Sequence, residues 1–209
     1  MVKATPHFPP SRAAVLPLVG GTLAFDLTNT SSGRGGPRWL EHLQTAGNVV
    51  DWARHAKILT ARDANRLHHL LAGDRRLAGR LLAGMIELRE LIHSVGVDIA
   101  AAARARAKHM DGLVRIHSLC LSRARLIPQA STFVWVWDPR ASPVEAIMGP
   151  VVLSALSVLT GSDLSRIRRC AGDHCGWLFF DATKNKRRRW CEMEVCGNRA
   201  KQKRRRART

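Results

Sequence analysis

Aromatic residues are scarce in this sequence, which contains no tyrosine and only 5% aromatic side chains. Six tryptophans supply most of the aromatic surface. Hydrophobic residues still make up 45% of the 209 residues, so a core can be buried. This length suffices for one domain of ordinary size and a small additional module.

Acidic residues are also few, since 16 Asp and Glu stand against 34 Lys and Arg, which gives a formal net charge of +18. The excess is concentrated at one end, because residues 164–209 hold 15 Lys and Arg against 4 Asp and Glu. So large a positive charge predicts affinity for a polyanion, either nucleic acid or an acidic membrane surface.

Export and membrane signals are missing from the sequence. Pro9 and Pro10 interrupt the start, where a signal peptide would need an apolar run, and no stretch of about 18 apolar residues is apparent. We therefore expect a cytoplasmic protein with no membrane span. In that compartment thiols stay reduced, which favours metal binding over disulfides for clustered cysteines.

Motifs of common enzymes are absent too. The sequence has no phosphate-binding loop, no nucleophile elbow and no H-E-x-x-H pair. A nuclease is the best enzymatic alternative, but it would need a histidine base and a second metal, and His174 is the only histidine near the cysteines. We therefore expect a protein that is not an enzyme.

Patterns of apolar residues predict an α+β fold that is mostly helical, with a small β-sheet in the N-terminal domain. A flexible lead is expected over residues 1–20 and the N-terminal domain over residues 21–163. Alternation predicts strands at residues 22–27 and 131–137. Helical periodicity is seen from residue 39 onward, with Thr60 as an N-cap, and residues 113–121 fit a helix or a strand. Residues 143–159 form an apolar helix, and Ser162-Asp163 caps a short helix that leads to Cys170.

Four of the five cysteines occur in two short-spaced pairs, with the pattern Cys170-x4-Cys175-x15-Cys191-x4-Cys196. Each pair can form a compact knuckle, and two knuckles supply the four sulfur ligands that a structural Zn²⁺ takes in a tetrahedron. Residues 177–181 and 187–190 read as two β segments around a turn at residues 183–185. The order knuckle, hairpin, knuckle, helix predicts a treble-clef-like zinc finger over residues 164–209, with its second knuckle at the start of a basic helix.

Other interpretations of the cysteines are weaker. Free thiols or two disulfides give no reason for the paired spacing. His174 could replace Cys175 as a ligand, but four cysteines already complete the shell, so a surface or supporting position is favoured.

These residues carry a family resemblance. The run Cys196-Gly197-Asn198-Arg199, with Trp190-Cys191 before it, resembles the CGNR zinc finger of bacterial proteins. Residues 23–30 and 49–52 are similar to the ABATE domain that accompanies this finger. The resemblance implies a stress-response transcription regulator whose finger binds DNA.

Two basic clusters flank the cysteines. The expected nucleic-acid contacts are Lys184, Lys186, Arg187, Arg188 and Arg189 in the turn, and Asn198, Arg199, Lys201, Lys203, Arg204, Arg205 and Arg206 after Cys196. Two clusters on one metal-fixed scaffold can follow a phosphate backbone, and double-stranded DNA is the expected partner. Arg199 either contacts phosphate or bonds carbonyls near the knuckle. The alternative for the last residues alone is a solvated tail, and Trp177 and Trp190 either stack on bases or form the core of the finger.

The N-terminal domain offers one polar group, formed by Asp26, Asn29 and Thr30. They lie at the end of the expected strand, where they either line a pocket for an unidentified small molecule or cap the strand end and hold the loop after it. Trp135 and Trp137 alternate with Val134 and Val136, so one pair faces the core and the other faces outward, and an exposed tryptophan face would suit a homodimer. Two further classes stay open beside the DNA-binding regulator, namely an RNA- or ribosome-associated protein and the nuclease.

Overall fold

The structure is a computed structural model that describes residues 10–34, 36–37 and 39–207. It confirms a mostly helical N-terminal region with small two-stranded sheets, followed by a four-cysteine cluster and a terminal helix. The helical elements are η1 (Ala13–Val15), α1 (Leu23–Thr28), α2 (Ala46–His55), α3 (Ala61–Gly73), α4 (Arg75–Ala100), α5 (Ala107–Leu121), α6 (Pro143–Gly161), η2 (Leu164–Arg166), η3 (Met193–Gly197) and α7 (Asn198–Arg206). The strands are β1 (Ser31–Ser32), β2 (Leu40–Glu41), β3 (Arg125–Gln129), β4 (Thr132–Val136), β5 (Ile167–Arg169) and β6 (Leu178–Phe180), and they form the antiparallel pairs β1–β2, β3–β4 and β5–β6.

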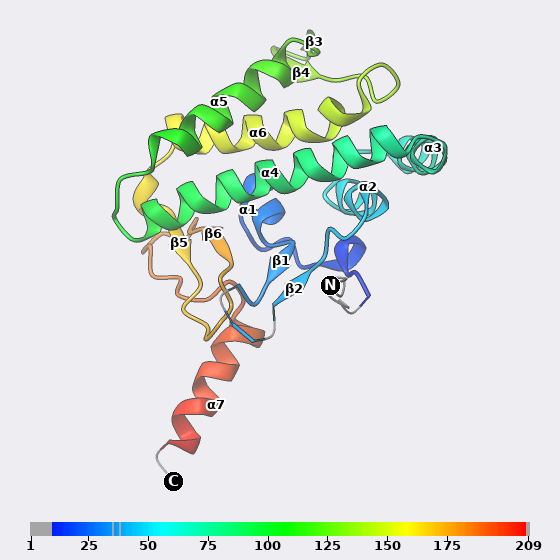
Figure 1. Cartoon of the computed structure of the whole chain (residues 1–209). Coiled ribbons are helices and arrows are strands. Elements are labelled where there is room, and N and C mark those ends of the chain that lie inside the picture. The colour runs from blue at the N-terminus through cyan, green and yellow to red at the C-terminus, as the bar shows by residue number, and fades with distance from the viewer. Residues whose placement is uncertain (1–9, 35, 38, 208–209) are drawn as a thin grey trace.

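The long helix α4 runs through the middle of the molecule (Figure 1). Helices α5 and α6 and the β3–β4 hairpin lie on one side of it, and α1, the short sheets and the cysteine-rich end lie on the other. The last helix, α7, points away from the rest of the chain. The hairpin and α7 therefore occupy opposite ends of the molecule.

The helical pattern read in residues 77–92 is confirmed by α4. Its N-cap is Asp74, whose carboxylate accepts a hydrogen bond from the Leu77 N–H at 2.8 Å. The apolar positions that recur at helical spacing are buried, namely Leu77, Leu81, Met85, Leu88 and Ile92. One stripe of α4 therefore forms the centre of the core.

The strand expected at residues 22–27 is wrong. These residues form the short helix α1, in which the hydroxyl of Thr22 accepts a hydrogen bond from the Phe25 N–H at 3.3 Å. Burial on several sides gives this helix the apolar pattern of a strand, because Ala24, Phe25 and Leu27 are all enclosed by α4, α6 and β6. Six residues are also too few to show a helical period.

Other expectations need smaller corrections. Residues 113–121 belong to α5, and the strand at residues 131–137 is confirmed as β4. The helix after Asp163 is only the single turn η2, and the chain continues as β5 up to Cys170. Strand β5 forms because β6 returns beside it, a pairing that local periodicity does not reveal.

The helix expected at residues 143–159 is confirmed as α6, and Pro150 lies inside it without ending it. Contrary to the expectation from sequence, α6 is long and apolar enough to cross a membrane by length and composition alone. Its buried residues include Ile147, Val151 and Val152, which belong to the main core. We therefore interpret α6 as a core helix.

The described part of the lead packs against the body. Ala13 and Leu16 are buried, and the carbonyl oxygen of Leu16 lies 2.7 Å from Nε2 of His55 on α2. Residues 1–9 lie outside the described residues. The domain boundaries given above remain predictions, but Ile167 and Leu178 from the cysteine-rich end share the main core with α4 and α1.

Candidate zinc centre and basic surface

Four cysteine sulfurs converge at the C-terminal end, as their spacing predicts. The Sγ atoms of Cys170, Cys175, Cys191 and Cys196 all lie within 4.8 Å of one another. The Cys175–Cys191 and Cys191–Cys196 sulfur separations are 3.7 and 3.6 Å. A tetrahedron with Zn–S bonds of 2.3 Å has S–S edges of about 3.8 Å. The donor set and its size therefore fit one zinc ion, and His174 is not among the clustered donors of the described residues.

The first knuckle depends on two glycines. Gly172 accepts a hydrogen bond from the Cys175 N–H at 3.1 Å, and a Cβ atom at Gly172 would lie 3.1 Å from Sγ of Cys196. Gly176 has a φ of 72°, which favours glycine. Glycine at position 172 thus leaves room for Sγ of Cys196, and glycine at position 176 permits the backbone conformation that follows Cys175.

Backbone N–H groups point at one of the sulfurs. The N–H groups of Gly172 and Cys191 donate to Sγ of Cys170 at 3.4 and 3.3 Å. Hydrogen bonds from the thiols of Cys175, Cys191 and Cys196 and from the Cys191 N–H lower the pKa of Cys170. The bond to Cys170 raises the pKa of Cys175 and of Cys191. The thiolate that a metal requires is therefore most favoured at Cys170.

The second knuckle leads directly into the last helix, as expected. Cys196 lies in the single π-helical turn η3, and its N–H bonds the carbonyl of Glu192 at 3.0 Å. Helix α7 begins two residues later, at Asn198. The positive end of the helix dipole therefore lies beside the sulfurs.

The hairpin expected within the finger is wrong in its pairing. Strand β6 pairs with β5, and residues 187–190 form no strand. The buried Asp181 explains this difference, because its carboxylate accepts from the N–H groups of Thr183 and Arg188 at 2.9 Å each. The chain is thus wrapped around one carboxylate, and the Arg189 carbonyl accepts from the Ala171 N–H of the first knuckle.

Arg188 differs from the other basic residues of this loop. Its guanidinium donates to the carbonyl oxygens of Val19 at 2.9 Å, Trp190 at 3.0 Å and Cys191. It also lies 4.2 Å from the centre of the Phe179 ring. Arg188 therefore joins the second knuckle to the N-terminal region, a role that the run of basic residues in the sequence did not reveal.

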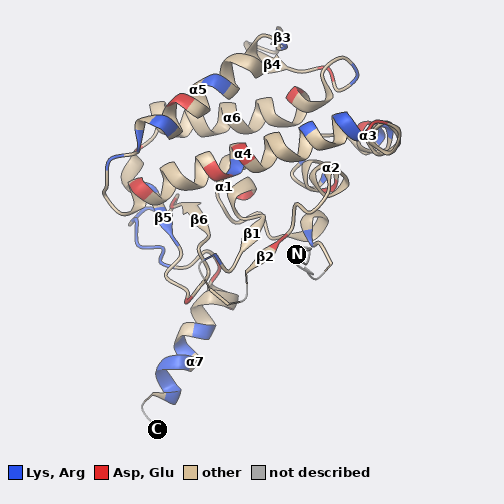
Figure 2. Ribbon diagram, in the orientation of Figure 1, with Lys and Arg blue, Asp and Glu red and all other residues tan. Residues whose placement is uncertain are grey.

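The remaining basic side chains face outward. Those of Lys184, Lys186, Arg187, Arg189, Arg199, Lys201, Lys203, Arg204, Arg205 and Arg206 are exposed, as is Asn198. Lys186 forms an ion pair with Asp163, and Lys203 forms one with Asp173 at 2.5 Å. Figure 2 shows the blue of Lys and Arg along the finger loop and α7. Residues 187–193 also line an open hollow of about 490 Å³.

The two tryptophans of the finger belong to its small core. Trp177 and Trp190 are half-buried against a cluster that contains Phe179 and the cysteines. The indole N–H of Trp177 donates to Oγ of Ser32 at 3.2 Å. This arrangement confirms the core interpretation over base stacking for Trp177.

Comparison with known families agrees with this geometry. Residues 166–209 match the CGNR zinc finger, and residues 21–162 match ABATE, described as "Putative stress-induced transcription regulator". The chain belongs to the ABATE family. No curated protein matches it.

The ABATE domain holds the finger through several backbone contacts. The side-chain amide of Asn29 bonds both the N–H and the carbonyl of Leu178, and the Gly33 N–H donates to the Cys175 carbonyl at 3.2 Å. Just before the domain, the Gly20 carbonyl accepts from the Phe180 N–H at 2.8 Å. His93 on α4 adds a bond of 3.2 Å from Nε2 to the carbonyl of Gly176. The finger is thus fixed on the ABATE domain.

A buried ion network supports the same contact region. The guanidinium of Arg89, only 3% exposed, forms two bonds of 2.7 Å to Glu41 and one of 2.8 Å to Glu90. Glu90 also binds Arg34 through two bonds of 2.8 Å. Burial raises the pKa of Glu90, but the bonds and charges of both arginines outweigh it and lower the pKa to about 2. The loop that contacts Cys175 is therefore tied to α4.

The polar group predicted in the ABATE domain makes internal bonds. Asp26 accepts from the Gly20 N–H at 2.8 Å, and burial raises the pKa of its carboxyl to about 6. The hydroxyl of Thr30 donates to the Leu27 carbonyl at 2.7 Å and accepts from Arg89 at 3.3 Å. Together with the Asn29 bonds, these contacts support the capping role proposed for the group.

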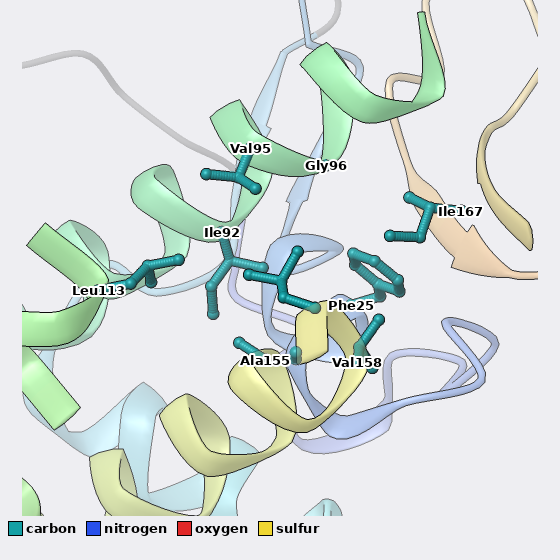
Figure 3. Close-up of a pocket in the computed structure, with 10 residues that line it drawn as sticks. Phe25, Ile92, Val95, Gly96, Leu113, Ala155, Val158 and Ile167 are labelled. Carbon is teal, nitrogen blue, oxygen red and sulfur yellow. The ribbon is translucent and has the colours of Figure 1, made fainter. Parts of the chain in front are cut away.

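An apolar cavity lies close to these residues, between α1, α4, α6 and β5. Phe25, Ile92, Val158 and Ile167 are among the side chains that line it (Figure 3). Its free volume is about 10 Å³. That is about the space of one water molecule, and an apolar cavity of this size stays dry.

Proposed function

We propose that this ABATE-family protein is a transcription regulator that binds double-stranded DNA through its CGNR finger. The observation that supports this most directly is the position of α7, which begins two residues after Cys196 and has no buried side chain. A helix that is charged on every side buries nothing in its own fold, so its stability comes from the knuckle and from a partner. An α-helix also fits the major groove of B-DNA.

The charge of this end favours the same partner. A net charge of +11 over residues 164–209 releases counterions from a phosphate backbone, which makes binding strong and dependent on salt. Arg199 and Lys203 share one face of α7, whereas Lys201 and Arg205 share another. Arginines on either face are placed to contact phosphates, and arginine also recognises guanine in the major groove.

We infer that one Zn²⁺ is bound by Cys170, Cys175, Cys191 and Cys196 and has a structural role. Four sulfur ligands fill a zinc shell and leave no position for water or substrate. The metal fixes the loop that carries Lys184 to Arg189 relative to α7. The loop is also held by Asp181 and Arg188, whereas α7 depends on the second knuckle for its support.

The ABATE domain, in this proposal, receives a signal or forms a dimer and transmits its state to the finger through the contacts of Asn29, Gly33 and His93. Such a regulator acts on the chromosome, so we expect it in the cytoplasm. A small molecule near Asp26, Asn29 and Thr30 remains a proposal and would have to replace hydrogen bonds that the fold already makes.

The test compares random double-stranded DNA with a structured RNA of similar length by fluorescence polarisation across a series of salt concentrations. We expect tighter binding to DNA, with a steep dependence on salt. The triple variant Arg187→Ala, Arg189→Ala, Arg199→Ala should weaken binding and flatten that dependence. The matched control removes the same charge from the exposed start of α4, through Arg75→Ala, Arg76→Ala and Arg80→Ala, and should keep most of the affinity.

Two results would overturn the proposal. Preferential binding of the RNA would identify an RNA-associated protein instead. Cleavage of DNA in the presence of magnesium, abolished by His174→Ala, would identify a nuclease.

A further inference from the structure

The β3–β4 hairpin presents an apolar face to solvent at the end of the molecule opposite to α7 (Figure 1). Leu126 pairs with Trp135 and Pro128 with Phe133, so these four side chains lie on one face. Three of them are large apolar side chains that are exposed, at 51% for Leu126, 66% for Phe133 and 39% for Trp135. Ile127 and Val134 on the other face are half-buried.

The two edges of the hairpin differ in their capacity to pair with another strand. A two-residue loop joins Gln129 to Thr132, so the pairs closed by ladder bonds are 129–132, 127–134 and 125–136. The N–H and C=O groups of Phe133 and Trp135 therefore point outward from β4. On β3 the outward positions are Leu126 and Pro128, and Pro128 has no N–H to donate. Arg125, at the start of β3, is charged and exposed.

Natural proteins block open strand edges with proline or charged residues, because an open edge pairs with any available strand. Strand β3 has both features. Strand β4, with the sequence Thr-Phe-Val-Trp-Val, has neither. The asymmetry indicates that β4 is covered in the working protein.

We propose that β4 pairs with β4 of a second copy of this chain, antiparallel and around a two-fold axis at Val134. In this register Phe133 lies opposite Trp135 of the partner subunit, and Trp135 opposite the partner subunit's Phe133. Each of these pairs closes two backbone hydrogen bonds and places two aromatic side chains side by side on the same face. A symmetric register shifted by two residues would pair Phe133 with Trp137, or Trp135 with Ser131, and both of these positions lie outside β4.

Charge favours a second copy at this end rather than elsewhere. The chain has a formal net charge of +18, and its most basic segments are the loop of residues 184–189 and α7, at the far end from the hairpin (Figure 2). Strand β4 contains no charged residue, so two copies meet there without a like-charged pair on the shared edge. Both α7 helices stay free to contact DNA.

This interface rests on the dimerising role given to the ABATE domain above, but its test is independent of DNA. We would measure the molar mass of zinc-loaded full-length protein by light scattering after size exclusion. The expected mass is twice the 23.1 kDa of one chain. A single-chain mass at every concentration would overturn the proposal.

Substitutions at two exposed positions on this face distinguish pairing of the two β4 edges from packing of one apolar face against the other. Phe133→Lys places a charge on the β4 edge and should give a single-chain mass. Leu126→Lys makes the same change on β3, away from the axis, and should keep the dimer. Loss of the dimer in both variants, or in neither, would overturn edge pairing.

A disulfide tests the register. Residues opposite each other in a non-hydrogen-bonded antiparallel pair have Cα atoms about 4.5 Å apart, within the range for a disulfide. Val134→Cys should therefore form a cross-linked dimer under mild oxidation, whereas the control Thr132→Cys should not. A dimer in which Val134→Cys fails to cross-link would contradict the register. DNA binding measured on Phe133→Lys separates this interface from the finger, because α7 is unchanged there.

Discussion

The side-chain amide of Asn29 forms two hydrogen bonds with the backbone of Leu178, each 3.0 Å long. Its Nδ2 donates to the Leu178 carbonyl, and its Oδ1 accepts from the Leu178 N–H. The amide thereby satisfies a donor and an acceptor of β6 as a neighbouring strand would. Both residues are buried, so water cannot replace either bond. One side chain of the ABATE domain therefore fixes the strand that leads out of the first zinc knuckle.

Asn29→Asp should destabilise the protein and loosen the finger. The substitution turns the donor into an oxygen that faces the Leu178 carbonyl, and a buried polar group left unpaired costs about 1–3 kcal/mol. Urea unfolding would measure the loss, and limited proteolysis would show earlier cleavage after residue 163. Asn65→Asp, the same change on the exposed surface of α3, should leave both readouts unchanged. Equal unfolding midpoints for the two variants would contradict this role of Asn29.

Two neighbouring arginines should behave in opposite ways. Arg187 is exposed, so Arg187→Ala should reduce the salt slope of DNA binding by about 0.9, the value for one phosphate contact, without a change in stability. Arg188 bonds three carbonyl oxygens, so Arg188→Ala should lower the free energy of unfolding by about 1–3 kcal/mol or more and speed zinc loss to a chelator. Salt titrations and chelator kinetics on both variants check this, and a destabilised Arg187→Ala beside an unaffected Arg188→Ala would refute it.

The four-cysteine cluster and the long helices could be predicted from the sequence because both depend on spacing along the chain. The paired cysteines specify the knuckles, and the apolar stripe of α4 specifies its buried face. The helix α1 could not be recognised, because its few residues are buried on several sides and show no clear period. The pairing of β6 with β5 was also hidden, since the carboxylate of Asp181 bends the chain that would have formed the expected hairpin. Asn29 and Arg188 have their roles only because the two ends of the chain meet.

Loss of one zinc ligand should remove the metal. Cys191→Ser leaves three sulfurs, so we expect purified protein without zinc and with an unfolded C-terminal end. Cys120→Ser is the matched control. Cys120 is buried in the main core, and burial raises the pKa of its thiol to about 12, so it stays protonated and binds no metal. Metal analysis should give one zinc per chain for the native protein and for Cys120→Ser, and the absence of zinc from the native protein would refute the site.

The contact between His93 and Gly176 should make stability depend on pH. Burial, with a contribution from Arg34, lowers the pKa of His93 to about 4 from its usual 6.5. Between these values the unfolded chain binds a proton that the folded chain does not, so stability falls as the pH drops from 6.5 and levels off near 4. The shift corresponds to about 3 kcal/mol across that window.

His93→Gln keeps a donor for the Gly176 carbonyl but cannot titrate, so urea midpoints of the native protein should fall below those of the variant as the pH is lowered. Asp26 has the opposite tendency, since its raised pKa of about 6 gives stability that is lost as the pH rises from 4 to 6. That effect is present in both proteins and cancels in the difference between them, as does protonation of the zinc ligands. His69→Gln, an exposed histidine on α3, should follow the native protein at every pH. A constant difference between the native protein and His93→Gln would show that His93 is not held neutral at the junction of the ABATE domain and the finger.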